Sequence, residues 1–303
     1  MWKKYQTHVF LHLIIFIWGF TGILGKLIHL EAFVLVWFRL LIAFLSLGLY
    51  LVFFKKIQII KSKKDFYLTV FTGILALVHW LTFYKSIQLS TASLGILCLS
   101  TATIHITWMQ PLLLKKKFSW IEFLMALFII YGIYFVSNDF SATEYEALFY
   151  GLFSALCASG FNVLNEKLVQ NISSGTLTFY ELLSGFLVLT TILVFQNKMN
   201  LSIFDMSWGD FYWLLFLGIV CTSLAFLFTI DIIKKLGSYT VSLSINMEPV
   251  YTIILAVILL NEHTLLNTSF YIGAVFIIII VFANAIIKNY QRKKNEKILQ
   301  KPD

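Results

Sequence analysis

Stretches of about twenty mostly apolar residues recur along the whole chain, and this repetition constrains the fold more than any other feature of the sequence. A helix of that length crosses the roughly 30 Å hydrocarbon core of a bilayer. Hydrophobic residues make up 59% of the chain and charged residues 13%, whereas a soluble domain has about half and a quarter. The sequence therefore predicts an all-α polytopic membrane protein.

We predict ten membrane-spanning helices joined by short loops. No small-residue cleavage site follows the first apolar run, so we expect that run to remain as a helix. The predicted spans are His8–Lys26, Phe33–Phe54, Phe66–Tyr84, Thr91–Leu113, Trp120–Val136, Ala147–Leu168, Leu177–Phe195, Phe211–Ile230, Tyr239–Leu260 and Phe270–Ile287.

Lysine and arginine residues are distributed unequally between the two sides that these spans define. One side, which includes both termini, receives 19 of them, and the other receives only Lys26, Lys85 and Lys198. Because basic loops are retained in the cytoplasm, we expect both termini to be cytoplasmic. Topology and lipid headgroups then account for the net charge of +8, and we expect no nucleic-acid partner.

The ten spans divide into five and five, at residues 1–140 and 141–303. An odd number of helices per half makes the second half start from the opposite face, so homologous halves would form an inverted repeat. Two pairs of segments support this interpretation: "WGFTGILGK" with "SGFNVLNEK", and "QLSTASL" with "KLGSYTV".

Three segments carry a resemblance to a known family: "FIWGFTGILGKLI", "HWLTFYKSIQLS" and "NMEPVYTIILAVILLNEHTLLNTSFYIGAVFIII". They resemble the drug/metabolite transporter superfamily, and most closely its EamA-type members. The resemblance implies a ten-helix carrier in the cytoplasmic membrane that moves small polar metabolites, often outward as an exporter. The first half departs from the pattern, because Gln110-Pro111 stands where the second half has Glu248-Pro249.

Glu248 is the principal candidate for a functional residue, because it lies near the middle of the predicted ninth span. Pro249 lacks an N–H, so the carbonyl of Ile245 would lose its helical donor. Together with Asn246, these residues predict a polar notch that faces a water-filled cavity. Glu248 would either bind an amino group of the substrate or take up and release a coupling proton. The alternative is a structural kink.

Other polar and aromatic side chains are candidates for the same cavity, and some of them share a helix face with further residues. The alternative is that the hydroxyls join helices and the aromatic rings form an interface belt. Trp18 is central in the first helix. Ala158, Asn162 and Asn165 share a face of the sixth helix, and Cys98, Thr101, His105 and Trp108 share a face of the fourth. The full set of predicted substrate-binding residues is Trp18, His79, Trp80, Tyr84, Thr101, His105, Asn162, Asn246 and Glu248.

Arg39 and Glu181 are two further charges inside predicted spans. Inverted topology would place them on opposite sides of the bilayer, so we expect that they do not pair. The favoured interpretation of each is a snorkelled or otherwise paired structural charge, and a functional role is the alternative.

Two other classes of function compete with a transporter: an intramembrane enzyme, and a channel or structural membrane protein in which Glu248 is structural. The chain has no His-Glu-x-x-His motif and no nucleotide-binding loop. "CASG" at 157–160 lacks the leading glycine of an intramembrane serine protease loop. Cys98, Cys157 and Cys221 lie in apolar runs without metal-ligand spacing. We predict a carrier with a small-molecule substrate in a lipid bilayer, and no catalytic residue, metal or cofactor.

Overall fold

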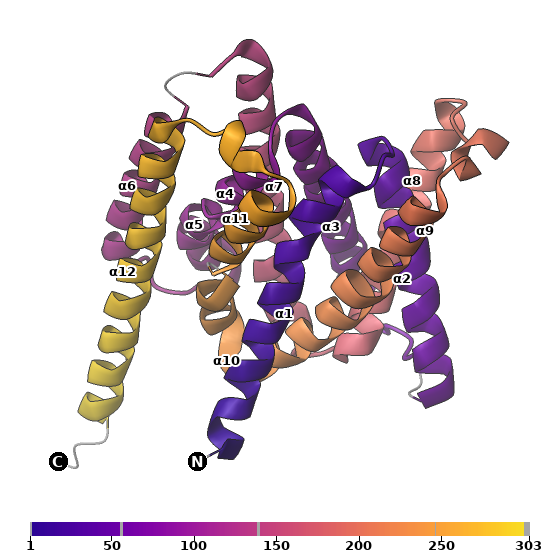
Figure 1. The fold of residues 1–303 in the computed structure, drawn as a ribbon. Coiled ribbons are helices and arrows are strands. Elements are labelled where there is room, and N and C mark those ends of the chain that lie inside the picture. The colour runs from indigo at the N-terminus through magenta and orange to yellow at the C-terminus, as the bar shows by residue number, and fades with distance from the viewer. Residues whose placement is uncertain (1, 55–56, 138–139, 246, 300–303) are drawn as a thin grey trace.

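The computed structural model describes residues 2–54, 57–137, 140–245 and 247–299, and every regular element in these ranges is helical (Figure 1). The elements are α1 Trp2–Leu27, α2 Ala32–Phe54, α3 Lys63–Leu89, α4 Ala92–Leu99, α5 Ala102–Leu114, α6 Trp120–Val136, α7 Ala142–Leu168, α8 Ser174–Phe195, η1 Leu201–Phe204, α9 Trp208–Leu215, η2 Phe216–Leu224, α10 Ala225–Ile245, α11 Glu248–Leu259, η3 Glu262–Thr264 and α12 Thr268–Leu299.

Within the described ranges, seven helical segments are long and apolar enough to cross a membrane, and this confirms the prediction of an all-α polytopic membrane protein. They are Gln6–Leu27, Ala32–Phe54, Lys63–Leu89, Ala92–Leu114, Ala142–Leu168, Ser174–Phe195 and Trp208–Leu236. Three shorter apolar helices accompany them: Trp120–Val136, Glu248–Leu259 and Thr268–Asn284.

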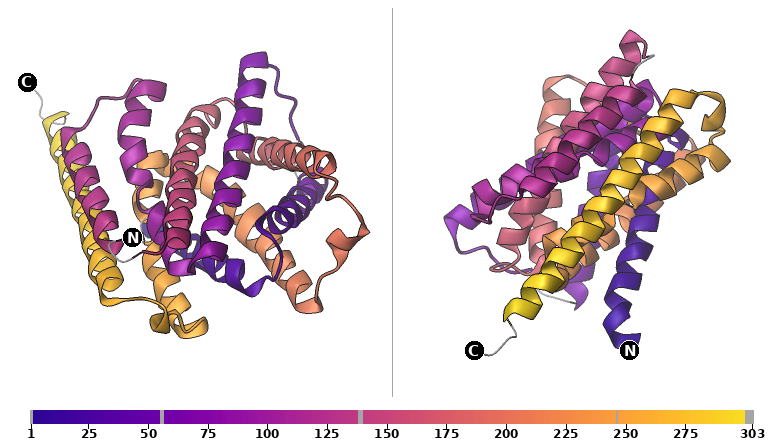
Figure 2. Two further views of the ribbon diagram at one scale, coloured as in Figure 1. Left: turned by 90° about the horizontal axis from the view of Figure 1, so that it is seen from above. Right: turned by 90° about the vertical axis from the view of Figure 1, so that its left-hand side faces the viewer.

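The two ends of the chain lie at the same end of the helix bundle, which we call the termini side (Figure 1). Helix α3 packs along α7 and α8 in the middle of the bundle, and α6 packs along α12 at its edge (Figures 1 and 2). The contact between α3 and α8 is especially close at Gly73, where a Cβ atom would lie 2.4 Å from the carbonyl oxygen of Glu181. Only glycine permits that approach of one helix to the other.

The predicted fourth span, Thr91–Leu113, agrees with the long apolar segment Ala92–Leu114, but its helix is not continuous and divides into α4 and α5. At the break, the amide of Ser100 bonds to the carbonyl of Leu97, and that of Thr101 to Cys98, each at 3.0 Å. The Thr101 hydroxyl also donates to the Cys98 carbonyl, at 2.6 Å. A hydroxyl that bonds to a nearby carbonyl competes with regular helical hydrogen bonding, which accounts for the break.

A second break lies between α10 and α11, inside the predicted ninth span. Helix α10 continues to Ile245, past the predicted end at Ile230, because no proline interrupts its backbone before Pro249. A new helix then begins at Glu248, with Pro249 in its first turn. Since the first amides of a helix have no intrahelical acceptor, Pro249 costs no hydrogen bond there. The prediction of one continuous helix over Tyr239–Leu260 is therefore wrong, because a new helix starts at Glu248.

Helix α9 leads into α10 through a π-helical segment, η2, which the sequence did not reveal. The Thr222 hydroxyl donates to the carbonyl of Leu217, five residues earlier, at 2.7 Å. π-Helical turns widen a helix locally and are frequent at functional sites. Here the segment places Cys221 and Thr222 in the interior of the bundle.

Candidate functional site

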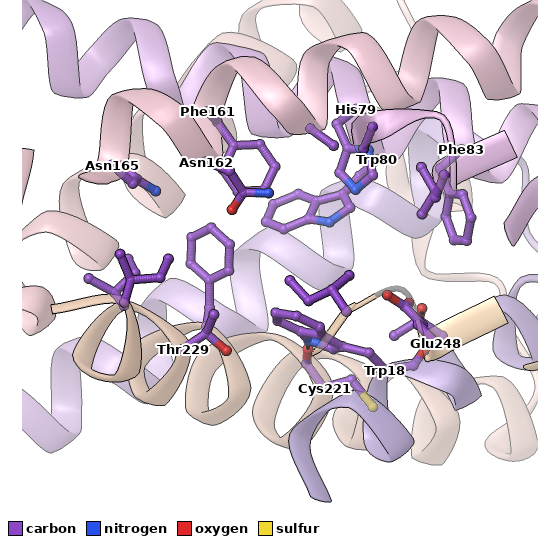
Figure 3. Close-up of a pocket in the computed structure, with 18 of the residues that line it drawn as sticks. Trp18, His79, Trp80, Phe83, Phe161, Asn162, Asn165, Cys221, Thr229 and Glu248 are labelled. Carbon is purple, nitrogen blue, oxygen red and sulfur yellow. Dashed lines mark hydrogen bonds between the residues drawn. The ribbon is translucent and has the colours of Figure 1, made fainter. Parts of the chain in front are cut away.

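A cavity of about 100 Å³ lies between α1, α2, α3, α7, α10 and α11, with room for several water molecules (Figure 3). Polar and charged side chains share its wall with aromatic rings. The polar and charged residues are Thr21, Arg39, His79, Asn162, Asn165, Thr229 and Glu248. The aromatic residues are Trp18, Trp80, Phe83, Phe161 and Phe226.

Glu248 is 7% exposed and is the first residue of α11. A carboxylate at a helix N-terminus interacts favourably with the helix dipole, which stabilises this position. Among the described residues, no donor forms a hydrogen bond with the Glu248 carboxylate. Because α11 begins at Glu248, the carboxylate of this residue lies in the cavity wall and is available to bind a ligand.

Arg39 faces the same cavity and is only 3% exposed. Its Nε donates to the Thr222 hydroxyl at 2.8 Å, and its Nη1 donates to the Tyr84 hydroxyl at 3.1 Å. The guanidinium carbon lies 4.3 Å from the centroid of the Trp80 ring, at a distance that gives a cation–π interaction. These three contacts fix the orientation of the guanidinium group.

The Arg39 and Glu248 charges attract each other across the cavity. In the described part of the chain they are not within ion-pair distance, and Arg39 retains N–H groups beyond the two that bind Thr222 and Tyr84. Arg39 and Glu181 have separate partners, because Glu181 contacts Asn165. The cavity thus offers a cation and an anion to one ligand.

His79 is held in one orientation by Ser154 of α7. The Ser154 hydroxyl donates to the carbonyl of His79 at 3.0 Å, so the ring Nδ1 donates to Ser154 Oγ at 2.7 Å. This arrangement places the ring proton on Nδ1 and leaves Nε2 as an acceptor. The ring stacks against Phe83, with centroids 6.0 Å apart.

Trp18 is held in a comparable way from the other side of the cavity. Its indole N–H donates to the carbonyl of Cys221 at 3.1 Å. That carbonyl belongs to the π-helical segment η2, in which regular i to i−4 bonding is interrupted. The unexpected π-helix therefore orients an aromatic residue that the sequence did predict.

Five of the predicted site residues line this cavity together: Trp18, His79, Trp80, Asn162 and Glu248 (Figure 3). The structure places the others elsewhere. Tyr84 is fully buried behind Arg39 and does not line the cavity.

Thr101 and His105 line a different pocket, of about 330 Å³ and mostly apolar, between α5, α6 and α7. Their predicted place in the cavity is wrong, because they lie where α5 packs against α6 and α7. Asn246 lies outside the described residues.

The structure adds cavity residues that sequence reasoning missed. Arg39 was interpreted as a structural charge, because its partners Thr222 and Trp80 come from distant parts of the sequence. Asn165 shares a helix face with Asn162, and this spacing was the signal that could have identified it. Phe161 and Phe226 carry no polar signal, and their ring centroids lie 5.7 Å apart in the wall.

Comparisons with known proteins agree with this architecture. The model of the EamA-like transporter family matches the chain twice, at residues 7–138 and 146–285. The chain is 23% identical over 244 residues to the uncharacterized transporter YxxF of Bacillus subtilis (strain 168), a match that covers 79% of this chain and 77% of that protein. A protein crystal structure with 12% sequence identity superposes with a TM-score of 0.65, covering 93% of this chain and 97% of that one, and so shares the fold. The chain belongs to the EamA-like transporter family and is a membrane transporter.

Proposed function

We propose that this transporter is a secondary-active carrier that exports small zwitterionic metabolites, such as amino acids and related compounds, by alternating access. The observation that carries the proposal is the presence of Arg39 and Glu248 in one cavity. An α-amino acid has one carboxylate and one ammonium group, which complement these two charges. The aromatic wall formed by Trp18, Trp80 and Phe161 suits an apolar or aromatic side chain.

The proposed architecture is ten membrane spans arranged as two inverted five-helix repeats, residues 1–140 and 141–303. The twofold match of the family model, to 7–138 and 146–285, supports two repeats. The seven long apolar segments and the three shorter apolar helices together number ten, which is the number that the proposal requires. The excess of basic residues on the termini side supports cytoplasmic termini in the cytoplasmic membrane.

In this orientation the cavity would load from the cytoplasm. It extends toward Asn165, near the end of α7, and Glu248 and Asn165 lie at opposite ends of the residues labelled in Figure 3. On the far side, Glu262 accepts hydrogen bonds from the amides of Ala92 and Ser93 at 2.7 and 3.0 Å, and these bonds would hold that side closed. Lys26 adds a bond to the carbonyl of Ser90, at 2.5 Å. Alternating access would require these contacts to break.

Counterflow in proteoliposomes tests the proposal. Amino acids would be compared with two analogues of each, one without the amino group and one without the carboxylate. Glu248→Gln should weaken exchange of the amino acids about ten- to a hundredfold, because one charge-assisted contact of roughly 1.5–3 kcal/mol is lost. Exchange of analogues that lack the amino group should change little. Glu31→Gln, at an exposed carboxylate, is the matched control.

Two results would contradict the proposal. One is exchange of amino acids by Glu248→Gln at the wild-type rate and affinity. The other is the absence of counterflow by the folded wild-type protein with every zwitterion tested.

A further inference from the structure

Glu181 of α8 is a second carboxyl group in the interior of the bundle, and the cavity residues described above do not use it. Its side chain is 2% exposed. Asn165 of α7, itself 1% exposed, directs its Nδ2 toward Glu181 Oε2 at 3.5 Å. Glu181 Oε1, Asn165 Oδ1 and the hydroxyl of Thr178 are all buried and have no hydrogen-bond partner in the part of the chain that the structure describes.

One hydroxyl beside Glu181 is oriented to accept a hydrogen. The Thr72 hydroxyl lies beside the carboxyl group, but its own hydrogen goes to the carbonyl of Thr69, at 2.7 Å. Thr72 therefore presents oxygen lone pairs to Glu181, whereas Asn165 directs an N–H group toward Oε2. A carboxylate has only acceptors to offer such a hydroxyl, whereas a protonated carboxyl group has an O–H to donate.

No cation compensates Glu181 within the described residues. The helices packed against it are α2, α3 and α10, with Asn165 contributed by α7. The titratable side chains in the interior of these helices have other partners: Arg39 binds Thr222 and Tyr84, His79 binds Ser154, Asp231 binds Ser174, and Glu166 binds Lys116. An ionised carboxylate without a partner at this depth is costly, and the cost is removed when the group is neutralised.

Asn165 connects the site to the cavity, because it also lines the cavity wall. We propose that Glu181 is the proton-binding site of this carrier, which takes up a proton on Oε1 and releases it to the cavity past Asn165. The inference rests on the proposed transport function and assigns its coupling ion to Glu181, leaving Glu248 to the substrate. Binding and release form and break a single O–H bond.

Infrared spectroscopy detects the proton without any substrate. The full chain would be reconstituted in lipid and titrated with alkali, while the carbonyl band of protonated carboxyl groups is followed. A band that disappears on titration should be present in the wild type and in Glu31→Gln, and absent in Glu181→Gln. Loss of the same band on addition of Na⁺ at constant pH would overturn the assignment to a proton, as would its presence in Glu181→Gln.

The Thr72→Val variant gives a second, independent test, which does not depend on whether Glu181→Gln folds. The quantity measured is the pH at which the infrared band disappears. If Thr72 accepts from the protonated group, its removal should make the band disappear at a lower pH than in the wild type. A shift to higher pH would mean that Thr72 donates to a carboxylate, and would contradict the proposal.

Transport assays then separate this inference from the proposed function. Glu181→Gln should retain amino-acid counterflow but lose its acceleration by a pH gradient, whereas Glu248→Gln should lose counterflow. Retained acceleration in Glu181→Gln overturns the coupling site and leaves the carrier intact. If no zwitterion is exchanged by the wild type, the proposed function fails, while the infrared band still decides whether Glu181 holds a proton.

Discussion

Arg39 shows how the surroundings of a residue decide its role. In the bilayer an arginine is costly, but here the Thr222 and Tyr84 hydroxyls and the face of Trp80 replace part of its hydration. These contacts use two of its nitrogen atoms and one face of the planar group. The remaining N–H groups are fixed in direction, which reduces the entropy lost when a carboxylate binds.

We expect Arg39→Lys to weaken the binding of substrates that carry a carboxylate by about tenfold, or roughly 1.5 kcal/mol. Lysine keeps the charge but cannot bond to Thr222 and Tyr84 while stacking on Trp80. Counterflow as a function of substrate concentration measures the change. Thr222→Val, which removes one anchoring bond and leaves the guanidinium, should have a smaller effect. Equal affinities in all three proteins would show that Arg39 does not bind substrate.

At the scale of elements, the two helix breaks have different chemical causes. The α4–α5 break follows from hydroxyl groups that bond to nearby carbonyls, as Thr101 does with Cys98. The α10–α11 break ends at Pro249, which is tolerated in the first turn of a helix and nowhere else without a lost bond. Only the second break is marked in the sequence by a residue type, the proline at 249. Even there we predicted one continuous span, with a structural kink as the alternative.

Pro249→Ala should therefore be nearly neutral. Alanine is acceptable in the first turn of a helix, so we expect a change in the free energy of unfolding within about 1 kcal/mol and little change in counterflow. Thermal unfolding in detergent and counterflow in liposomes measure the two quantities. A loss of transport in Pro249→Ala larger than that in Glu248→Gln would restore the interpretation of this segment as a structural kink.

At the scale of the whole molecule, the sequence predicts the all-helical class, because the length of its apolar runs matches the thickness of a bilayer. It predicts the family through the resemblance of three segments. Five of the nine predicted site residues also line the cavity, since isolated polar side chains in apolar runs face other polar groups in the interior of the bundle. Thr101 and His105 could not be placed, because their position depends on how α5 packs against α6 and α7. The role of Arg39 depends on partners from other helices, such as Thr222, which no local pattern records.

The proposed topology predicts the sidedness of labelling. Single cysteines at Lys61 and Lys116 should react with a membrane-impermeant thiol reagent only from the cytoplasm, and one at Thr143 only from outside. The single cysteines are introduced into a variant in which the three native cysteines, Cys98, Cys157 and Cys221, are replaced. All three are buried. Reaction of the cysteines at Lys116 and Thr143 from the same side would exclude the ten-span arrangement.

The π-helical segment η2 has a consequence for how this chain tolerates insertions and deletions. A π-turn holds one residue more than an α-turn, so the deletion of one residue within Phe216–Leu224 would restore regular α-helical bonding. The preceding residues would then rotate by about 100° relative to α10, since an α-helix has 3.6 residues per turn. Asp210, which accepts a hydrogen bond from the amide of His29 at 2.9 Å, would be carried away from it. A relative one residue shorter in this segment would thus present a different helix face to its neighbours.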